Sequence, residues 1–372
     1  MLTGKNMSTI YGKCAEGMTY CNDLLIWSRF EEAGYATAYG EDYLSLPDTF
    51  SRYQGFAAPP THHYLRPFFL TGENQQGPLL CTKKIPSAVN VLNYAADFAQ
   101  TYVNESFFGF FWTNSYSHNY GHSPTLLDED IVNLFRKLTS LGVMNNTIVV
   151  FASDHGIRYG VMRLPVESYY EERLPMLFMW IPTEFRNSHS ESYINSVQNQ
   201  FRLTTPYDFY MTFWDILQKG NSQLTVPVSE ACPRCTSLFS PIPKDRNCAD
   251  AMVSKQWCSC HTLTKVSEHE DGAKQSVALA CVEFKRRRTN TKDDRHSGRP
   301  TTVVTKGNET NQSMPWERPS SPTAEKFKAS QRKAVCRKDP ELFSEKGVVM
   351  IEYLDHVASY GLCVGRTYIK IA

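Results

Sequence analysis

The stretch Thr147-Ile148-Val149-Val150-Phe151-Ala152-Ser153-Asp154-His155-Gly156 decides the fold class of this chain. Its apolar, mostly β-branched half predicts a buried strand, and Gly156 lets the chain turn sharply after it. In open α/β sheets, ligands bind just outside the carboxyl ends of the strands. An adjacent carboxylate and imidazole at that place, Asp154 and His155, can offer oxygen and nitrogen donors to a metal ion. The structural alternative is an aspartate that caps a following helix beside a histidine that packs.

Alternating helix and strand patterns surround this stretch from residue 21 to about 219. Apolar spacing predicts helices at 21–32, 87–103 and 126–141, with Gly34 and Gly142 ending the first and the third. Strands are predicted at 106–113 and 176–181, and a last helix begins at Thr205-Pro206 with Asp208 in its first turn. Strand, helix and strand in this order predict an α/β fold: a doubly wound, mostly parallel sheet with helices on both faces.

Composition limits the classes of partner. The chain has 372 residues, and its 39 Lys and Arg nearly balance its 38 Asp and Glu, which argues against a polyanionic partner such as nucleic acid. No apolar run approaches the roughly 20 residues that a membrane-spanning helix needs. Residues 1–13 are polar and lack the apolar core of a signal peptide.

Cysteines and glycosylation sequons nevertheless indicate an extracellular or secretory origin. The chain has eleven cysteines. Asn-X-Ser/Thr sequons, which would make the protein a glycoprotein, occur at Asn6, Asn104, Asn145, Asn308 and Asn311. An incomplete N-terminus would reconcile these features with the missing signal peptide.

The chain divides into three parts. Residues 1–219 form the α/β core, and residues 220–281 form an extension of the same domain that is rich in cysteine and proline. Disulfides are predicted among the cysteines of this extension, which are Cys232, Cys235, Cys248, Cys258 and Cys260. A zinc site built from Cys232, Cys235, Cys258 and Cys260 is the alternative, although the Cys258-X-Cys260 spacing is one residue short of the usual knuckle.

The third part, residues 282–372, is polar, basic and poor in apolar periodicity. It includes Lys285-Arg-Arg-Arg288 and reaches a strand-like pattern only at Gly347-Val-Val-Met-Ile351. Such a composition predicts a poorly ordered tail, because it cannot bury enough apolar surface to offset its ordering entropy. A basic patch for nucleic acid is the alternative, but such charge runs are usually solvated.

Further candidate site residues follow the strands. His118 and Asn119 come after the strand at 106–113, and one helix separates that strand from the next, so we expect the two strands to be neighbours. His118 should then face Asp154 across one crevice. Arg158 and Glu172, downstream of the Asp-His pair, could support the ligands or hold an anionic group.

The residues carry a resemblance to a known family. The runs Thr147-Ile-Val-Val-Phe-Ala-Ser-Asp-His-Gly-Ile-Arg-Tyr-Gly160, Tyr170-Glu-Glu-Arg-Leu-Pro175 and Arg202-Leu-Thr-Thr-Pro-Tyr-Asp208 resemble domain-of-unknown-function family 229. This family is a nematode and arthropod branch of the alkaline phosphatase/sulfatase superfamily. The resemblance covers residues 2 to 261, and it is carried further by Gly34-Tyr-Ala-Thr-Ala-Tyr-Gly-Glu-Asp42, Tyr64-Leu-Arg-Pro67, Ser117-His-Asn119 and Trp257-Cys-Ser-Cys260.

The resemblance implies an alkaline-phosphatase-like fold with a metal-dependent phosphatase or sulfatase site. A small anionic ester would be the substrate, and a divalent metal ion, Zn or Ca, would be the cofactor. In that superfamily a metal-activated Ser, Thr or Cys attacks phosphorus or sulfur. Asp154 and His155 would be metal ligands, His118 a further ligand or substrate contact, and Asn119 a weaker candidate of the same kind.

The chain also departs from the superfamily pattern. The superfamily's first strand supplies a metal-binding Asp and its next helix supplies the nucleophile, and neither has a counterpart before the opening segment Leu2-Thr3-Gly4. Thr3 and Ser8 lack that strand context. We therefore expect a fold lacking its first strand, truncated at the N-terminus and catalytically inactive as written. The alternative is a non-catalytic secreted binding or structural protein.

The tail carries a second resemblance, to scattered pieces of a mariner-type transposase. It is carried by Phe284-Lys-Arg-Arg-Arg-Thr-Asn-Thr-Lys-Asp-Asp-Arg-His-Ser-Gly-Arg-Pro300, Gln312-Ser-Met-Pro-Trp316 and Lys346-Gly-Val-Val-Met-Ile-Glu-Tyr-Leu354. That enzyme holds divalent metal with three carboxylates, but Asn308 occupies the first position and Asp339 only echoes the second. The tail is thus interpreted as a transposon remnant. A DNA-binding, transposase-derived fusion is the second alternative.

Overall fold

The computed structural model describes residues 1–15, 17–46, 50, 56–76, 79–118, 124–156, 167–261, 350–352 and 368–371. All of these except His261 belong to one compact unit, formed by residues 1–260 and 323–372. Asn119 and Arg158, and most of the predicted tail, lie outside the described residues.

The unit is an α/β structure. Its helices are α1 (Met7–Cys14), α2 (Ile26–Glu32), α3 (Arg66–Leu70), α4 (Ser87–Tyr102), α5 (Asp128–Ser140), α6 (Ser168–Arg173), α7 (Thr183–Ser188), α8 (Ser190–Asn199) and α9 (Pro206–Gly220). Its strands are β1 (Ala36–Glu41), β2 (His63–Tyr64), β3 (Glu73–Gln76), β4 (Leu79–Thr82), β5 (Ile85–Pro86), β6 (Phe107–Trp112), β7 (Val149–Ala152), β8 (Met176–Trp180), β9 (Met350–Glu352) and β10 (Tyr368–Ile371).

The strands form three hydrogen-bonded sets. β2, β1 and β6 make a parallel set, and β3, β4 and β5 make a small antiparallel one. The third set has the order β10-β8-β7-β9. Within it β8 pairs in parallel with β10 and β7 with β9, but β8 runs antiparallel to β7, so this set is not parallel throughout. Apolar periodicity predicts that a strand is buried, but it carries no information on strand direction.

β6 and β7, which we expected to be neighbours, belong to different sets. β9 pairs in parallel with β7 and also contacts β6. β10 pairs in parallel with β8. Both strands come from the region 282–372, so the expectation of few contacts with the core does not hold for these short segments. The other residues of that region lie outside the described part, and their poor order stays a prediction.

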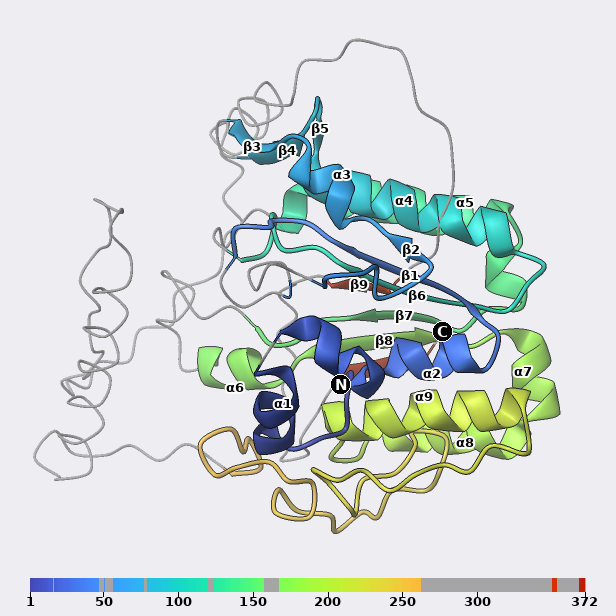
Figure 1. Ribbon diagram of the computed structural model, residues 1–372. Helices are drawn as coiled ribbons and strands as arrows, with labels where there is room; N and C mark the ends of the chain where they lie inside the picture. The colour runs from blue at the N-terminus through green and yellow to red at the C-terminus, as the bar shows by residue number, and fades with distance from the viewer. Residues whose placement is uncertain are drawn as a thin grey trace, which may run out of the picture. The chain divides into compact units, whose positions relative to one another are not determined.

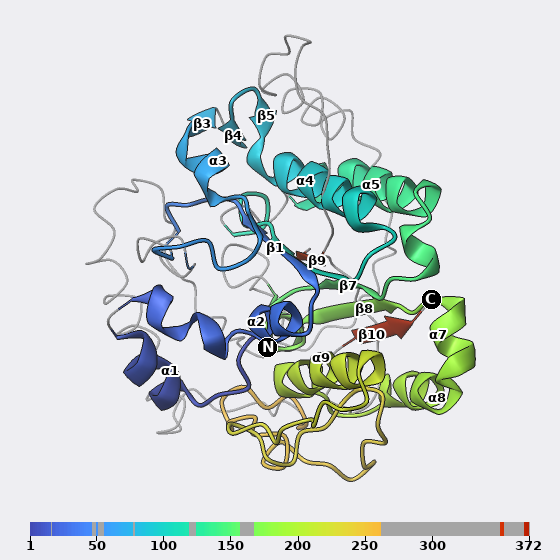
Figure 2. The ribbon, with the colours of Figure 1, turned by 45° about the vertical axis from the view of Figure 1, so that its right-hand side comes forward.

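Two layers of helices cover the strands, with α4 and α5 on one side and α2 and α9 on the other (Figures 1 and 2). Strand β6 contributes to both hydrophobic cores because its side chains alternate. Phe108 and Phe110 pack in the core that contains residues of α2 and α9, whereas Phe111 packs in the core of α4 and α5. This alternation explains why the strand reads as an unbroken aromatic run.

Local signals set several element boundaries as predicted. Gly34 and Gly142 adopt positive φ angles of 85° and 76° directly after α2 and α5, as C-terminal glycines do. Thr205, Pro206 and Asp208 form a full capping box with Pro in the first turn of α9. Helix α2 begins later than the predicted start at residue 21, because Leu25 is extended and separates a 3₁₀ turn at Met18–Leu24 from α2.

The cysteine-rich segment after α9 packs on the core through long-range bonds. Arg246 is 4% exposed and donates from Nη1 to Oδ2 of the fully buried Asp208 at 2.9 Å. Disulfides join Cys232 to Cys235, Cys248 to Cys258 and, near the N-terminus, Cys14 to Cys21. The pairs Cys232–Cys235 and Cys248–Cys258 agree with the predicted disulfides and use three of the four cysteines of the alternative zinc site. Cys260, the fifth predicted candidate, forms no disulfide within the described residues. No helix among the described residues is long and apolar enough to cross a membrane.

Candidate metal site

The candidate site begins where β7 ends. Ala152 is the last residue of β7, and the backbone amide of Ser153 still donates to the carbonyl of Met176 at 2.9 Å. Ser153 Oγ in turn accepts from the Met176 amide at 2.9 Å. These two bonds continue the pairing of β7 with β8 through Ser153. Asp154 and His155 therefore follow directly at the carboxyl end of β7.

Asp154 and His155 form a compact pair of donor atoms. The Asp154 carboxylate accepts from the His155 amide through Oδ1 at 2.7 Å, and its Oδ2 lies 3.3 Å from His155 Nε2. The two side chains are 47% and 34% exposed. The pair thus offers one oxygen and one nitrogen donor at a partly exposed place.

The second nitrogen of His155 makes a hydrogen bond that requires a proton on Nδ1. Nδ1 lies 2.8 Å from the carbonyl oxygen of Gly156, which can only accept, so Nδ1 must be the donor. A neutral ring of this tautomer presents the lone pair of Nε2 to the Asp154 carboxylate. Two lone pairs at 3.3 Å repel each other unless a proton or a metal ion lies between them. Metal-binding histidines have the same arrangement, with the other ring nitrogen donating to a carbonyl.

Gly156 lets helix α6 pack tightly against this turn. Its amide donates to the carbonyl of Glu172 at 3.3 Å. A Cβ at position 156 would lie 2.0 Å from the carbonyl oxygen of Glu171 and 3.1 Å from the amide nitrogen of Glu172. Only glycine permits this approach. The glycine therefore serves the docking of α6 as well as the turn.

Glu172, a predicted supporting residue, reaches the turn through its backbone. Its side chain is buried, and Oε2 accepts from Nη1 of Arg173 at 3.1 Å. The structure thus brings together Asp154, His155 and the α6 backbone at Glu172. Asn119 and Arg158 lie outside the described residues.

His118 lies in a turn after β6. Its amide donates to the carbonyl of Asn114 at 2.9 Å, and its ring meets the ring of Tyr43 edge-on at a centroid distance of 6.4 Å. The ligand atoms of His118, Asp154 and His155 do not all lie within 4.8 Å of one another; in the described part of the chain, Cys248, Cys258 and Cys260 alone form such a group. The predicted approach of His118 to Asp154 within about 8 Å stays a prediction.

A buried carboxylate pair supports the His118 turn, and sequence reasoning missed it. Asp42, which directly follows β1, accepts from the Asn114 amide through Oδ1 at 2.6 Å, and Ser115 Oγ donates to its Oδ2. Glu41 accepts from Asn114 Nδ2 at 3.0 Å and from the hydroxyl of Tyr39. The carboxylates thus tie the end of β1 to the turn that carries His118.

Burial changes the protonation of this pair. Desolvation raises the pKa of Glu41 from 4.5 to about 7, and it raises the pKa of Asp42 from 3.8 to about 7. Hydrogen bonds from Tyr39, Asn114 and Ser115 oppose these shifts but do not cancel them. The sequence contained a signal for this pair, because Glu41 and Asp42 stand at the end of a strand, as Asp154 does after β7.

One family profile matches most of the chain. Its description is "Protein of unknown function (DUF229)", and the match spans residues 1–302. The chain belongs to this family. No curated protein matches the chain, and no solved structure matches it. The match contains every candidate site residue, and it continues past residue 281 into the segment that we assigned to the tail.

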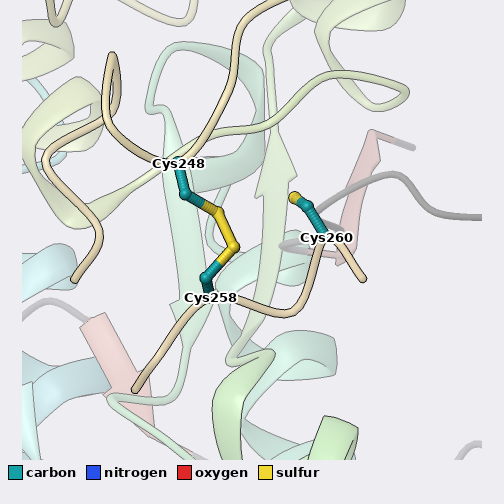
Figure 3. A group of neighbouring side chains, drawn as sticks. All are labelled: Cys248, Cys258 and Cys260. Atoms are coloured by element: carbon teal, nitrogen blue, oxygen red, sulfur yellow. A yellow bond between two sulfur atoms is a disulfide. The ribbon is translucent and has the colours of Figure 1, made fainter. Parts of the chain in front are cut away.

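The DUF229 region also contains a cluster of sulfur atoms. Cys248 and Cys258 form a disulfide, and the sulfur of Cys260 lies with both of theirs inside 4.8 Å (Figure 3). Sulfur is a good zinc ligand only as thiolate, so the disulfide removes two of the three donors while it is oxidised. The oxygen and nitrogen donors of Asp154 and His155 need no such change.

Proposed function

We propose that this DUF229 chain binds a divalent metal ion through Asp154 and His155, as a domain of the phosphate- and sulfate-ester hydrolase type. The observation that carries the proposal is the orientation of His155. Its Nδ1 is committed to the Gly156 carbonyl, so Nε2 faces the Asp154 carboxylate at 3.3 Å with a lone pair to share. A metal ion between the two atoms would turn their repulsion into two bonds.

The distance between the donors fits a metal ion. Two ligands about 2.0–2.2 Å from a tetrahedral ion lie roughly 3.3–3.5 Å apart, and the observed separation of Asp154 Oδ2 and His155 Nε2 is 3.3 Å. Zinc accepts both carboxylate oxygen and imidazole nitrogen. Calcium prefers oxygen and would need more oxygen ligands, so we place zinc first.

The substrate class follows from the family resemblance. A bound divalent ion neutralises the charge of a phosphate or sulfate ester and stabilises the charge that develops when the ester is cleaved. His118 is proposed as a further ligand or substrate contact, on the turn held by Asp42. The proposed architecture is the doubly wound alkaline-phosphatase-like sheet, which the helices on both sides of the strands support.

We propose that the chain binds metal without turning over ester substrate. Thr3 and Ser8, the nucleophile candidates near the start, lie outside the context that the superfamily uses, where a strand leads into the nucleophile's helix. Thr3 accepts a hydrogen bond from the Lys5 amide, and Ser8 lies inside α1. An ester hydrolase without an activated nucleophile is slower by many orders of magnitude.

Isothermal titration with zinc and a turnover assay test both parts. We expect the full chain to bind zinc, and we expect Asp154→Ala and His155→Ala to lose binding. His189→Ala, which changes a half-buried histidine at the C-cap of α7, should keep it. Affinity should fall at lower pH because protons compete for the ligands.

Aryl phosphates and sulfates should show no turnover above a buffer blank. Equal zinc binding by wild type and Asp154→Ala would reject the site, and metal-dependent turnover that Asp154→Ala abolishes would reject the inactive assignment.

The disulfides favour one second candidate, a non-catalytic secreted binding protein that keeps the fold. Cys14–Cys21, Cys232–Cys235 and Cys248–Cys258 suit an oxidising compartment. In that case inorganic phosphate or sulfate would bind to the zinc-loaded chain without any change to the anion. Titration of the zinc-loaded chain with each anion separates this candidate from a metal site that holds no anion.

A further inference from the structure

Arg173, the last residue of α6, contacts its own helix and the loop that contains Gln256. Its Nη1 donates to the carbonyl of Tyr169 at 3.0 Å and to Oε2 of Glu172 at 3.1 Å. Its Nε donates to the carbonyl of Gln256 at 3.1 Å. The Arg173 side chain is 15% exposed, and its bonds to Tyr169 and Glu172 are partly buried, whereas its bond to Gln256 lies nearer the surface. Arg173 therefore joins helix α6 to the loop that the Cys248–Cys258 disulfide closes.

The disulfide-closed loop, residues 248–258, makes two further contacts with α6. The hydroxyl of Tyr169 donates to the carbonyl of Cys258 at 3.1 Å. The guanidinium of Arg173 lies over the ring of Tyr169 at 3.9 Å and over the ring of Trp257 at 5.3 Å. A planar guanidinium can stack and donate sideways at once, which an ammonium group cannot do. The loop thus holds α6 through Arg173 and Tyr169 together.

Helix α6 also contacts the turn that carries Asp154 and His155. The Gly156 amide donates to the Glu172 carbonyl, and no room exists for a Cβ between Gly156 and Glu171. The Gly156 carbonyl in turn accepts from His155 Nδ1 and so fixes the tautomer of that ring. A continuous series of contacts runs from the disulfide-closed loop through Arg173 and α6 to the His155 ring.

We propose that Arg173 is a positioning residue for Asp154 and His155, and that the Cys248–Cys258 disulfide holds the loop against which Arg173 is anchored. When Arg173 or the disulfide is removed, α6 loses its outer support, and the Gly156–Glu172 contact opens more often. The effect on metal binding rests on the proposed function. The effect on the Gly156 amide does not, because that hydrogen bond exists without a metal ion.

Hydrogen exchange of the Gly156 amide, followed by NMR without metal, tests the positioning role directly. We compare wild type with Arg173→Gln, Arg173→Lys and the double variant Cys248→Ser/Cys258→Ser. Arg234→Gln is the matched control, because Arg234 lies in the same cysteine-rich segment and pairs with Asp250, with a side chain that is 74% exposed. Thermal unfolding of each variant shows whether the whole fold has changed.

We expect Arg173→Gln and the cysteine double variant to speed exchange at Gly156 about tenfold, and to weaken zinc binding by about 10–100-fold, as losses of residues that support metal ligands do. Arg173→Lys should recover only part of the effect, since lysine keeps the charge but not the stacking fork. Arg234→Gln should change neither quantity. Exchange at amides in β1 should stay unchanged, which a general loss of stability would not allow.

Two results would overturn the proposal. One is unchanged exchange at Gly156 in Arg173→Gln and in the cysteine double variant. The other is faster exchange at every amide alike, which would mean that Arg173 supports the fold in general. If wild type binds no zinc but Gly156 still responds to Arg173→Gln, the proposed function fails and the positioning role stands. The two failures are therefore distinguishable.

Discussion

The amide of Gly156 donates to the carbonyl oxygen of Glu172 at 3.3 Å, and this bond joins the turn after β7 to helix α6. The approach is close enough that a Cβ on residue 156 would lie 2.0 Å from the Glu171 carbonyl oxygen. The glycine of the Asp-His-Gly run is thus a packing requirement of α6.

Gly156→Ala should therefore displace α6 or the turn. Because the obstacle is backbone and cannot rotate away, we expect a loss of stability on the order of 2 kcal/mol and weaker zinc binding. Urea unfolding measures the first effect and calorimetry the second. Gly12→Ala is the control, since Gly12 lies in α1 with nothing within 4 Å of its Cβ position. Equal midpoints for Gly156→Ala and wild type would contradict the packing role.

Glu41 should make stability depend on pH. Its pKa is raised from 4.5 to about 7, so the folded state retains a proton that the unfolded state releases. The contribution of this group to stability is therefore largest below about pH 4.5, falls as the pH rises and levels off above about 7. The ionised group costs on the order of 3 kcal/mol.

Urea unfolding of wild type and Glu41→Gln at several pH values measures this cost. The stability of wild type relative to Glu41→Gln should fall between about pH 4.5 and 7. Glu32→Gln, which removes an exposed carboxylate paired with Arg29, should show no such trend. A constant difference between wild type and Glu41→Gln across this range would show that burial does not control the carboxyl.

The Asp208–Arg246 pair should be the strongest link between α9 and the cysteine-rich segment. The two side chains are 0% and 4% exposed, and burial raises the pKa of Asp208 while Arg246 opposes that rise. Arg246→Met leaves a buried carboxylate without its cation, so we expect a loss of about 3–5 kcal/mol. Arg234→Met, at an exposed pair, should cost less than about 1 kcal/mol. Similar losses in both variants would mean that the buried pair has no special role.

Residues 282–372 should be the first to be cut by trypsin, at Lys285-Arg-Arg-Arg288, which leaves a resistant fragment ending near Cys260 or Cys281. We expect residues 1–281 alone to stay folded, with faster hydrogen exchange in β7 because β9 no longer pairs with it. Unfolding of this fragment would make the tail an integral part of the core. Unchanged exchange in β7 would mean that β9 does not pair there in solution.

Periodic patterns predicted the elements that bury a regular face. The helix at α5 was found because its apolar residues keep one period over its whole length, and the strand β6 was found because it is a short, unbroken aromatic run. β1 was not predicted, since Ala-Thr-Ala-Tyr-Gly-Glu has little β-branched content, and its place depends on contacts such as the stacking of Tyr39 on Trp27 at 5.2 Å. Because β1 was not predicted, the Glu41-Asp42 pair at its end was not recognised as a site either.

The sequence predicted the adjacent residues of the candidate site, Asp154 and His155. It did not predict the contacts with helix α6, which come from residues farther along the chain. Adjacency in sequence brings Asp154 and His155 together whatever the fold, so the pair could be named from the run alone. The support from Glu172 and Arg173 depends on how α6 packs, which no short spacing encodes. The antiparallel direction of β8 was missed for the same reason, because direction is set by the connection between strands and not by their periodicity.

X-ray absorption at the zinc edge tests the metal site most directly, because it identifies the atoms bound to zinc. The Asp154–His155 site predicts only oxygen and nitrogen neighbours, at about 2.0–2.2 Å, and loss of bound zinc in Asp154→Ala. Sulfur neighbours at about 2.3 Å would instead place the ion at Cys248, Cys258 and Cys260. That result, or an unchanged oxygen and nitrogen shell in Asp154→Ala, would contradict the account.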